Sequence, residues 1–274
     1  MKKQMIQRGV FASTCLLITA LVPRVFGQGA LTPPGAPAPT MKTLNQIEAR
    51  TPIASAPFTI AASGSYYLTT NLTVSAGNAI TVSANNVTLD LNGFTLASTE
   101  NPAALGYGIK LNSVTNITIM NGFISGGVTN NGGVYGGSGF AYGILSVGSY
   151  PVNARVSGVS VSGCRYMGIG LGYNNTVVES CTVNTVGSYG INAQMVSDST
   201  ALNCGNTGVS ATTANNCSGT SSGSGDGIYA TAVATGCYGY SASGAGVHAF
   251  IASLCHGETT SGTALLVTHN VNSF

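Results

Sequence analysis

Two acidic residues fall at matching places in consecutive repeated stretches of this 274-residue chain. Glu179 and Asp198 lie on neighbouring stretches, and Arg155 lies one stretch earlier. If the stretches stack as β-strands, about 4.8 Å apart, the two carboxylates come within about 5 Å of each other. Such a pair can share a proton, bind Ca²⁺ or hydrolyse a glycosidic bond. A catalytic site of Glu179, Asp198 and Arg155, with Arg155 paired to Glu179 or in a lyase-like role, is therefore one hypothesis.

The alternative role for these acids is structural. They belong to a polar column with one member in each stretch: Asn92, Asn121, Ser157, Glu179, Asp198, Asn215, Thr235 and Ser253. Asn92-Gly93 and Asn121-Gly122 mark this column as a turn, where side-chain amides can bond along the stack as an asparagine ladder. The whole chain has only seven acids, which leaves little material for acid–base chemistry. We therefore expect a turn ladder and keep the enzyme as the alternative.

A second column carries aromatic rings. Tyr107, Tyr142 and Tyr189 each lie two residues before a repeated Ile, and Tyr166 is one residue off that register. A row of exposed rings can stack against sugars with a large contact area. The other interpretation is that the rings only cover a turn. The sequence thus offers Tyr107, Tyr142, Tyr166 and Tyr189 as a binding row for polysaccharide.

Six cysteines follow residue 27. One inward column contains Phe94, Phe123, Val159, Cys181, Thr200, Cys217, Cys237 and Cys255, whereas Cys164 and Cys204 lie off it, two stretches apart. Stacked cysteines have disulfide-like Cα distances but parallel side chains. We expect them to be small core residues, with a disulfide as the alternative. The histidines form no zinc-ligand pattern, so no cofactor is expected unless the acids bind Ca²⁺.

These columns exist because the chain repeats a phrase: Gly, then Ile or Val, then any residue, then a small or aliphatic one. The apolar positions are Ile109, Ile144, Ile169, Ile191, Val209, Ile228, Val247 and Leu265, spaced by 35, 25, 22, 18, 19, 19 and 18 residues. Short alternating runs such as Val87–Leu91 indicate strands, and Gly, Asn and Ser between them indicate turns. The pattern predicts an all-β fold, a right-handed parallel β-helix of about eight to nine coils.

Three segments resemble the opening coils of secreted bacterial β-helix proteins of the pectin-lyase-like superfamily: Ser63–Leu68, Asn86–Phe94 and Asn116–Phe123. The resemblance covers roughly residues 58–274 and implies the right-handed fold. It implies no single activity, because that superfamily contains lyases, hydrolases and adhesins. The Arg-Pro motif and acidic calcium cluster of its pectate lyases are missing here, as are the paired aspartates and Gly-His-Gly of its polygalacturonases.

The segments outside the repeats indicate export. The expected organisation is a signal peptide at 1–27, a Pro-rich linker at 28–40, a cap segment at 41–57 with a short amphipathic helix at 41–50, and the β-helix at 58–274. The apolar run Val10–Val22 is short for a membrane span, so none is expected after cleavage. Residues 124–142, rich in Gly and Asn, are expected to form a surface loop.

Charge narrows the choice of partners. Without the signal peptide, five basic residues remain against seven acidic ones, a net charge of −2. No basic patch is present, so nucleic acid is not an expected partner. Residues 271–274 follow a coil directly, and an open apolar coil would favour self-association through this end.

The sequence as a whole predicts a secreted or cell-surface β-helix. Its expected role is to bind extracellular polysaccharide or to act as a structural or adhesive element. A polysaccharide lyase or glycoside hydrolase, and a self-assembling surface protein, are the two alternatives.

Overall fold

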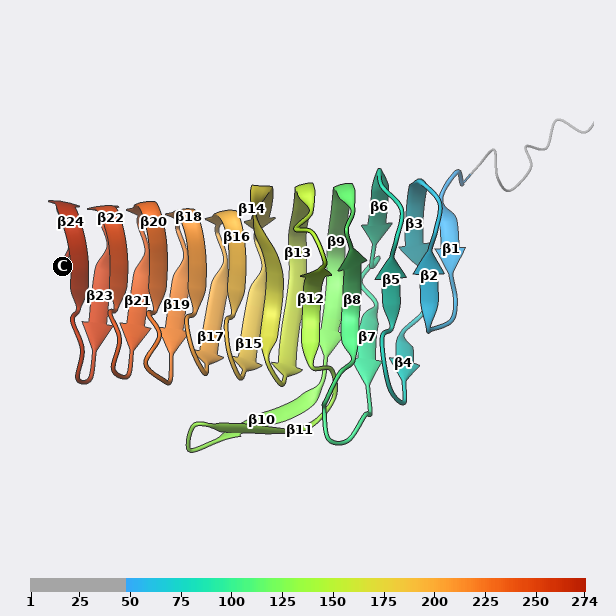
Figure 1. The fold of residues 1–274 in the computed structure, drawn as a ribbon, viewed down its shortest axis with the longest axis horizontal. Helices are drawn as coiled ribbons and strands as arrows, with labels where there is room; N and C mark the ends of the chain where they lie inside the picture. Colours follow the sequence, from blue (N-terminus) through green and yellow to red (C-terminus); the bar gives the residue numbers. More distant parts are fainter. Residues whose placement is uncertain (1–47) are drawn as a thin grey trace, which may run out of the picture. The chain divides into compact units, whose positions relative to one another are not determined.

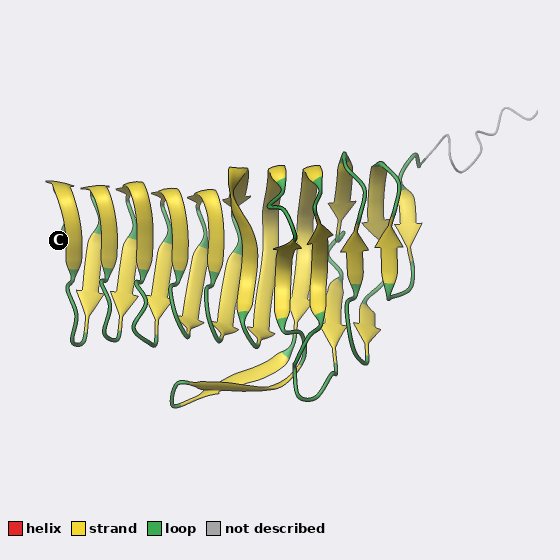
Figure 2. Cartoon of the chain, viewed as in Figure 1, coloured by secondary structure: helices red, strands yellow, loops and turns green. Residues whose placement is uncertain are grey.

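The computed structural model describes residues 48–274, which wind into a right-handed parallel β-helix (Figure 1). Each coil contributes strands to three faces, and short loops join them (Figure 2). The predicted fold class is confirmed, and the described residues contain no helix, including none that could span a membrane. The expected signal peptide and linker lie outside the described residues. So does most of the expected helix at 41–50, of which only the non-helical residues 48–50 are described.

The first face carries the repeated Gly-Ile/Val phrase. Its strands are β2 (Phe58–Ile60), β5 (Ile80–Val82), β8 (Tyr107–Asn112), β12 (Tyr142–Val147) and the first parts of β14 (Met167–Glu179), β16 (Ile191–Ser197), β18 (Val209–Asn215), β20 (Ile228–Thr235), β22 (Val247–Ser253) and β24 (Leu265–Val271). The predicted apolar column from Ile109 to Leu265 is in register along all of them, which confirms it.

The other two faces use the rest of each coil. The second face contains β1 (Thr51–Ile53), β3 (Gly64–Leu68), β6 (Val87–Asp90), the first parts of β9 (Thr115–Ser125) and β13 (Val152–Cys164), and the last parts of β14, β16, β18, β20, β22 and β24. The third face contains β4 (Leu72–Val74), β7 (Thr95–Ser98), the last parts of β9 and β13, β15 (Thr182–Val186), β17 (Thr200–Cys204), β19 (Ser218–Ser221), β21 (Tyr238–Ser241) and β23 (His256–Thr259).

The core narrows steadily toward the C-terminal coils. On the third face the inward column reads Leu72, Leu96, Ile124, Val161, Val183, Ala201, Gly219, Gly239 and Gly257. On the second face it reads Leu89, Ile119, Val156, Val178, Val196, Ala214, Ala234 and Ala252. Every member of both columns is buried. Because interiors are close-packed, the shrinking side chains bring the faces closer together along the axis.

At the narrow end two faces meet backbone to backbone. A Cβ atom built on Gly219, Gly239 or Gly257 would lie 2.1, 2.0 or 2.0 Å from the carbonyl oxygen of the residue directly before a first-face strand. The oxygens belong to Gly227, Gly246 and Ala264, respectively. Only hydrogen fits in that space, so glycine is required at these positions for a packing reason.

The predicted cysteine column is confirmed at its cysteines. Two of its other members, Phe123 and Thr200, are each wrong by one residue. Gly122, and not Phe123, is level with Val159. Thr200 pairs with Thr182, so Ser199 is the residue level with Cys181, and its Oγ accepts the Cys181 N–H at 3.1 Å. The column therefore includes a glycine and a buried serine, neither of which looks like an apolar core residue in the sequence.

All six cysteines among the described residues are free and buried, as the core interpretation expects. Burial raises the pKa of Cys164 and Cys204 to about 12 and that of Cys181 to about 11. Because the thiolate is the reactive form, we predict that iodoacetamide labels these thiols only after unfolding. Mass spectrometry of the chain lacking residues 1–27 checks this, and rapid labelling of the native protein would contradict it.

The insertion at 124–142 is a hairpin and not an open loop. β10 (Gly127–Asn131) and β11 (Val134–Ser138) pair antiparallel and run beneath the coils in Figure 1. The Tyr135 hydroxyl donates to the Asn203 carbonyl at 3.0 Å and bonds Ser222 Oγ at 2.8 Å. The hairpin is thus hydrogen-bonded to residues at the third face that come about 70 to 90 residues later in the sequence.

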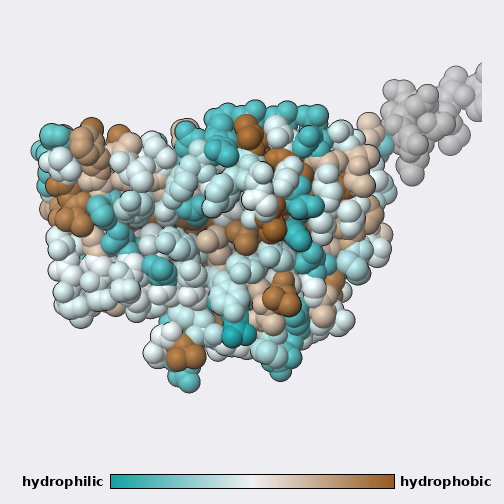
Figure 3. All heavy atoms as spheres, in the orientation of Figure 1, coloured by the Kyte–Doolittle hydropathy of each residue, from teal (hydrophilic) through white to brown (hydrophobic). Residues whose placement is uncertain are grey.

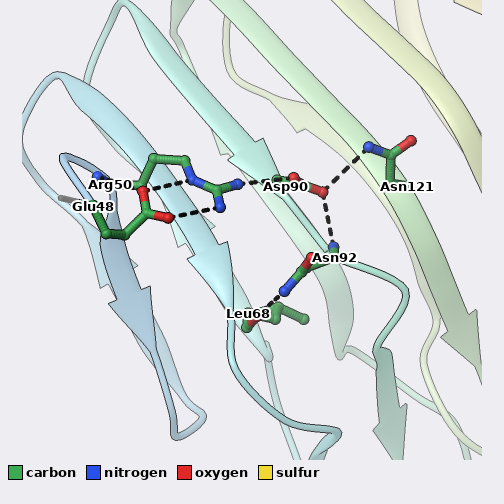
Figure 4. Close-up of polar contacts among 6 residues, drawn as sticks. All are labelled: Glu48, Arg50, Leu68, Asp90, Asn92 and Asn121. Atoms are coloured by element: carbon green, nitrogen blue, oxygen red, sulfur yellow. Dashed lines mark hydrogen bonds and ion pairs between the residues drawn. The ribbon is translucent and has the colours of Figure 1, made fainter.

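A charged network holds the first described coil (Figure 4). Arg50 forms ion pairs with Glu48 at 2.9 Å and Asp90 at 3.1 Å, and its guanidinium lies over the Tyr67 ring. Asp90 also accepts hydrogen bonds from the Asn92 N–H and from Asn121 Nδ2. The Arg50 hydrogen bonds hold the pKa of Glu48 below its usual value. These contacts attach residues 48–50 to the solenoid.

One face of the molecule can be judged in Figure 3. In Figure 3 the visible face is mostly hydrophilic, and apolar side chains occur on it in small separate groups. Scattered groups of this kind are normal for a protein surface.

Candidate functional site

Two side-chain columns run along the outside of the first face. The turn column lies two residues before each repeated apolar residue and contains Tyr107, Tyr142, Met167, Tyr189, Thr207 and Asp226. The strand column lies one residue after each repeated apolar residue. It contains Lys110, Leu145, Gly170, Asn192, Ser210, Tyr229 and His248. The predicted tyrosine column is thus the N-terminal part of a longer row.

Three of the four predicted tyrosines pack ring against ring, with Tyr107 and Tyr142 stacked and Tyr166 tilted by 36° against Tyr142. The Tyr107 and Tyr142 ring centroids are 4.9 Å apart with the planes 18° from parallel, and those of Tyr142 and Tyr166 are 5.4 Å apart. The backbone of Met167, and not that of Tyr166, is level with Tyr142. The Tyr166 ring nevertheless packs against the Tyr142 ring. The rings are partly exposed, and burial raises the pKa of Tyr142. We call these three rings the tyrosine stack.

The fourth tyrosine, Tyr189, lies further along and lines a pocket. This pocket has a volume of about 390 Å³ and is lined by Tyr173, Tyr189, Asn192, Thr207, Ser210, Ser224, Gly225, Asp226 and Tyr229. It lies between the turn column and the strand column. Its size falls within the range of small-molecule sites. Sequence reasoning placed Tyr189 in the row but did not identify the pocket.

Tyr173 forms one wall of this pocket because the chain bulges before it. The register of β14 against β16 shifts between Gly170 and Val177, and Gly172 has φ +74°. The Tyr173 hydroxyl accepts a hydrogen bond from Asn192 Nδ2 at 2.7 Å and bonds Ser210 Oγ at 2.9 Å. These bonds fix the ring across two coils of the strand column.

Asp226 supplies the one acidic group of the pocket lining. Its Oδ1 accepts the Ala245 N–H at 2.8 Å, and its Oδ2 lies 2.9 Å from His248 Nδ1. A carboxylate only accepts hydrogen bonds, so Nδ1 is the donor in this pair. The His248 ring in turn packs edge-on against Tyr229 at 4.9 Å. Asp226 is therefore fixed by backbone and side-chain donors, with 19% of its side chain exposed.

The predicted catalytic residues are not part of the pocket lining, and the two acids are not level with each other as the sequence suggested. Glu179 is level with Ser197, so its assignment opposite Asp198 is wrong by one residue. Asp198 is a turn residue with φ +49° and accepts a hydrogen bond from Asn216 Nδ2 at 3.1 Å. Arg155 and Glu179 form the expected ion pair, at 2.6 Å on the second face.

An asparagine ladder does form, but at a different turn of each coil from the one that holds the expected column. Asn116 Nδ2 donates to Asn86 Oδ1 at 2.7 Å, Asn153 Nδ2 donates to Asn116 Oδ1 at 3.0 Å, and Asn175 donates to Asn153. All four residues have φ between +55° and +58°, a conformation that asparagine tolerates better than most residues. Asn92 and Asn121 are turn residues, as predicted, but bond Leu68 and Asp90.

Within residues 48–274, no three His, Cys, Asp or Glu side chains are grouped so that they could hold a metal ion. Comparison of the chain with known protein families, curated proteins and solved structures gave no match. The function must therefore be inferred from the geometry of the first face.

Proposed function

We propose that this protein is exported and binds polysaccharide along its first face, between the turn column and the strand column. The observation that carries the proposal is the continuity of the tyrosine stack with the pocket on the same face. A distant relationship to the pectin-lyase-like superfamily is part of the proposal, as is delivery to the cell surface or the medium by the signal peptide at 1–27.

The shape of the row suits a long ligand. Six coil spacings separate Ile109 from Val247 along the first face, which is about 29 Å at 4.8 Å per strand. Aromatic rings provide large contact area to sugar rings with little loss of side-chain entropy. The pocket adds hydroxyl and amide groups from Tyr173, Ser210 and Asn192, which are the groups that bind sugar hydroxyls.

The partners of the acidic residues favour binding over catalysis at the sequence-predicted site. Glu179 is engaged by Arg155, and Asp198 by Asn216. A panel of polysaccharides scored for both retention and product release separates the two functions, since retention without product supports binding and product release supports an enzyme.

Replacing Tyr142 with alanine is predicted to weaken retention of the bound polysaccharide about tenfold, because Tyr142 is the middle ring of the tyrosine stack. Affinity electrophoresis in gels that contain each polysaccharide measures this effect. Tyr238→Ala is the control, since Tyr238 is an exposed ring that stacks on His256 on the third face, away from the proposed site. Equal loss in both variants, or no loss in either, would count against binding on the first face.

A further inference from the structure

We infer that the pocket of the first face selects a sugar unit that carries a protonated amine, as in a glucosamine oligomer. This inference rests on the proposed function and specifies the ligand of the same face. It follows from the charge of the pocket lining, the rings around it and the position of the nearest cations.

The charge of the lining is negative. Asp226 is the one charged residue among the nine that line the pocket, and the other polar groups are hydroxyls, an amide and backbone. Its carboxylate is held in place by the Ala245 N–H and by His248, so it does not have to reorganise when a ligand binds. A protonated amine in the pocket gains an oppositely charged neighbour in a partly desolvated place. An acidic sugar would meet the same carboxylate with no cation in the lining to balance it.

The tyrosine rings that line the pocket also favour a cationic ligand. Tyr173, Tyr189 and Tyr229 line it from three different coils. The face of an aromatic ring attracts a cation, and this attraction grows when the cation is partly removed from water. The hydroxyl of Tyr173 is already engaged by Asn192 and Ser210, which fixes that ring at the edge of the site.

The basic group nearest the pocket is His248, which donates its Nδ1–H to Asp226 and carries a charge only when it is protonated. The Lys and Arg side chains of the first face lie in earlier coils. Lys110 lies over the Tyr107 ring, four coil spacings before Ser210, or about 19 Å. Arg165 lies over Tyr166, and its guanidinium donates to the Ala103 carbonyl on the side away from the pocket. A separation of about 19 Å is more than two Debye lengths in physiological salt, so Lys110 has little effect on charge in the pocket.

The test compares two oligomers that differ in charge at one group. Glucosamine trimers and N-acetylglucosamine trimers have the same backbone, and each is titrated by calorimetry into the chain lacking residues 1–27 at a pH that keeps the amine protonated. We expect the amine trimer to bind at least about tenfold more tightly and to lose this preference as salt is added. In Asp226→Asn, whose side-chain oxygen can still accept the Ala245 N–H while its amide donates to a neutral His248 Nδ1, the preference should disappear.

Asp198→Asn is the matched control, since it removes a carboxylate from a turn where asparagine is equally suited. It should leave the preference unchanged. Equal binding of the two trimers by the native protein would overturn the inference and leave polysaccharide binding standing. If neither trimer binds, the inference fails, and the Tyr142→Ala comparison on the polysaccharide panel then decides the proposed function separately. A preference that persists in Asp226→Asn would also overturn the inference.

Discussion

Replacing Gly239 with valine is expected to lower the free energy of unfolding by about 3 kcal/mol. A Cβ atom at this position would lie 2.0 Å from the Gly246 carbonyl oxygen and 2.6 Å from its carbon. Both atoms belong to the backbone at the entry to the first-face strand β22, so no side-chain rotation can relieve the clash. The two faces would have to separate, which would break close packing across several coils.

Urea denaturation followed by circular dichroism measures this loss. Gly136→Val is the matched control, because nothing lies within 4 Å of a Cβ atom at Gly136, and its φ is not in the left-handed region. That variant should unfold within about 0.5 kcal/mol of the native protein. A Gly239→Val variant as stable as the control would show that the first and third faces are not in backbone contact.

The second large effect is expected from exchanging two members of the tapered column on the second face. Leu89→Ala leaves a cavity at the wide end and should cost about 3 kcal/mol. Ala234→Leu overfills the narrow end and should cost about 2 kcal/mol. Both positions are fully buried, and they are six coil spacings apart.

The double variant Leu89→Ala/Ala234→Leu has the same composition as the native chain. Because the sites are far apart and share no partner, the two losses should add to about 5 kcal/mol. The measurement is again the urea midpoint for each single variant and for the double. A double variant as stable as the native protein would falsify the idea that side-chain size is matched to position along the axis.

The coil arrangement could be predicted because one column is apolar in every coil. Ile109, Ile144 and Ile169 reveal the register directly. The second column was misassigned where its members are Gly122 and Ser199, since neither has an apolar side chain. Ser199 is nevertheless buried, because its hydroxyl donates to the Ser197 carbonyl at 2.7 Å and accepts the Cys181 N–H.

The same shift of one residue explains why Asp198 was placed level with Glu179. Choosing Thr200 as the core residue moved the polar column forward by one and placed Asp198 opposite Glu179. In the structure Ser180 and Asp198 are the equivalent left-handed turn residues, with φ +52° and +49°. A column defined only by apolar residues cannot locate a turn of this kind.

The pocket was partly visible in the sequence. Extending the tyrosine column beyond Tyr189 leads to Thr207 and then to Asp226. The residues that directly follow the repeated Ile228 and Val247 are Tyr229 and His248. What the sequence could not provide was the bulge after Gly172 that lays Tyr173 across the strand column. That contact depends on one irregular coil and not on the repeat.

The narrowing of the core has a consequence for how such a chain can grow by gene duplication. A duplicated coil packs only against neighbours of its own width, so a copy of the coil around Leu89 and Leu96 would not fit beside Ala234 and Gly239. Glycine has no smaller substitute, and the third face has already reached it by Gly219. On the third face, any further coil could therefore keep this width or become wider, but it could not continue the taper.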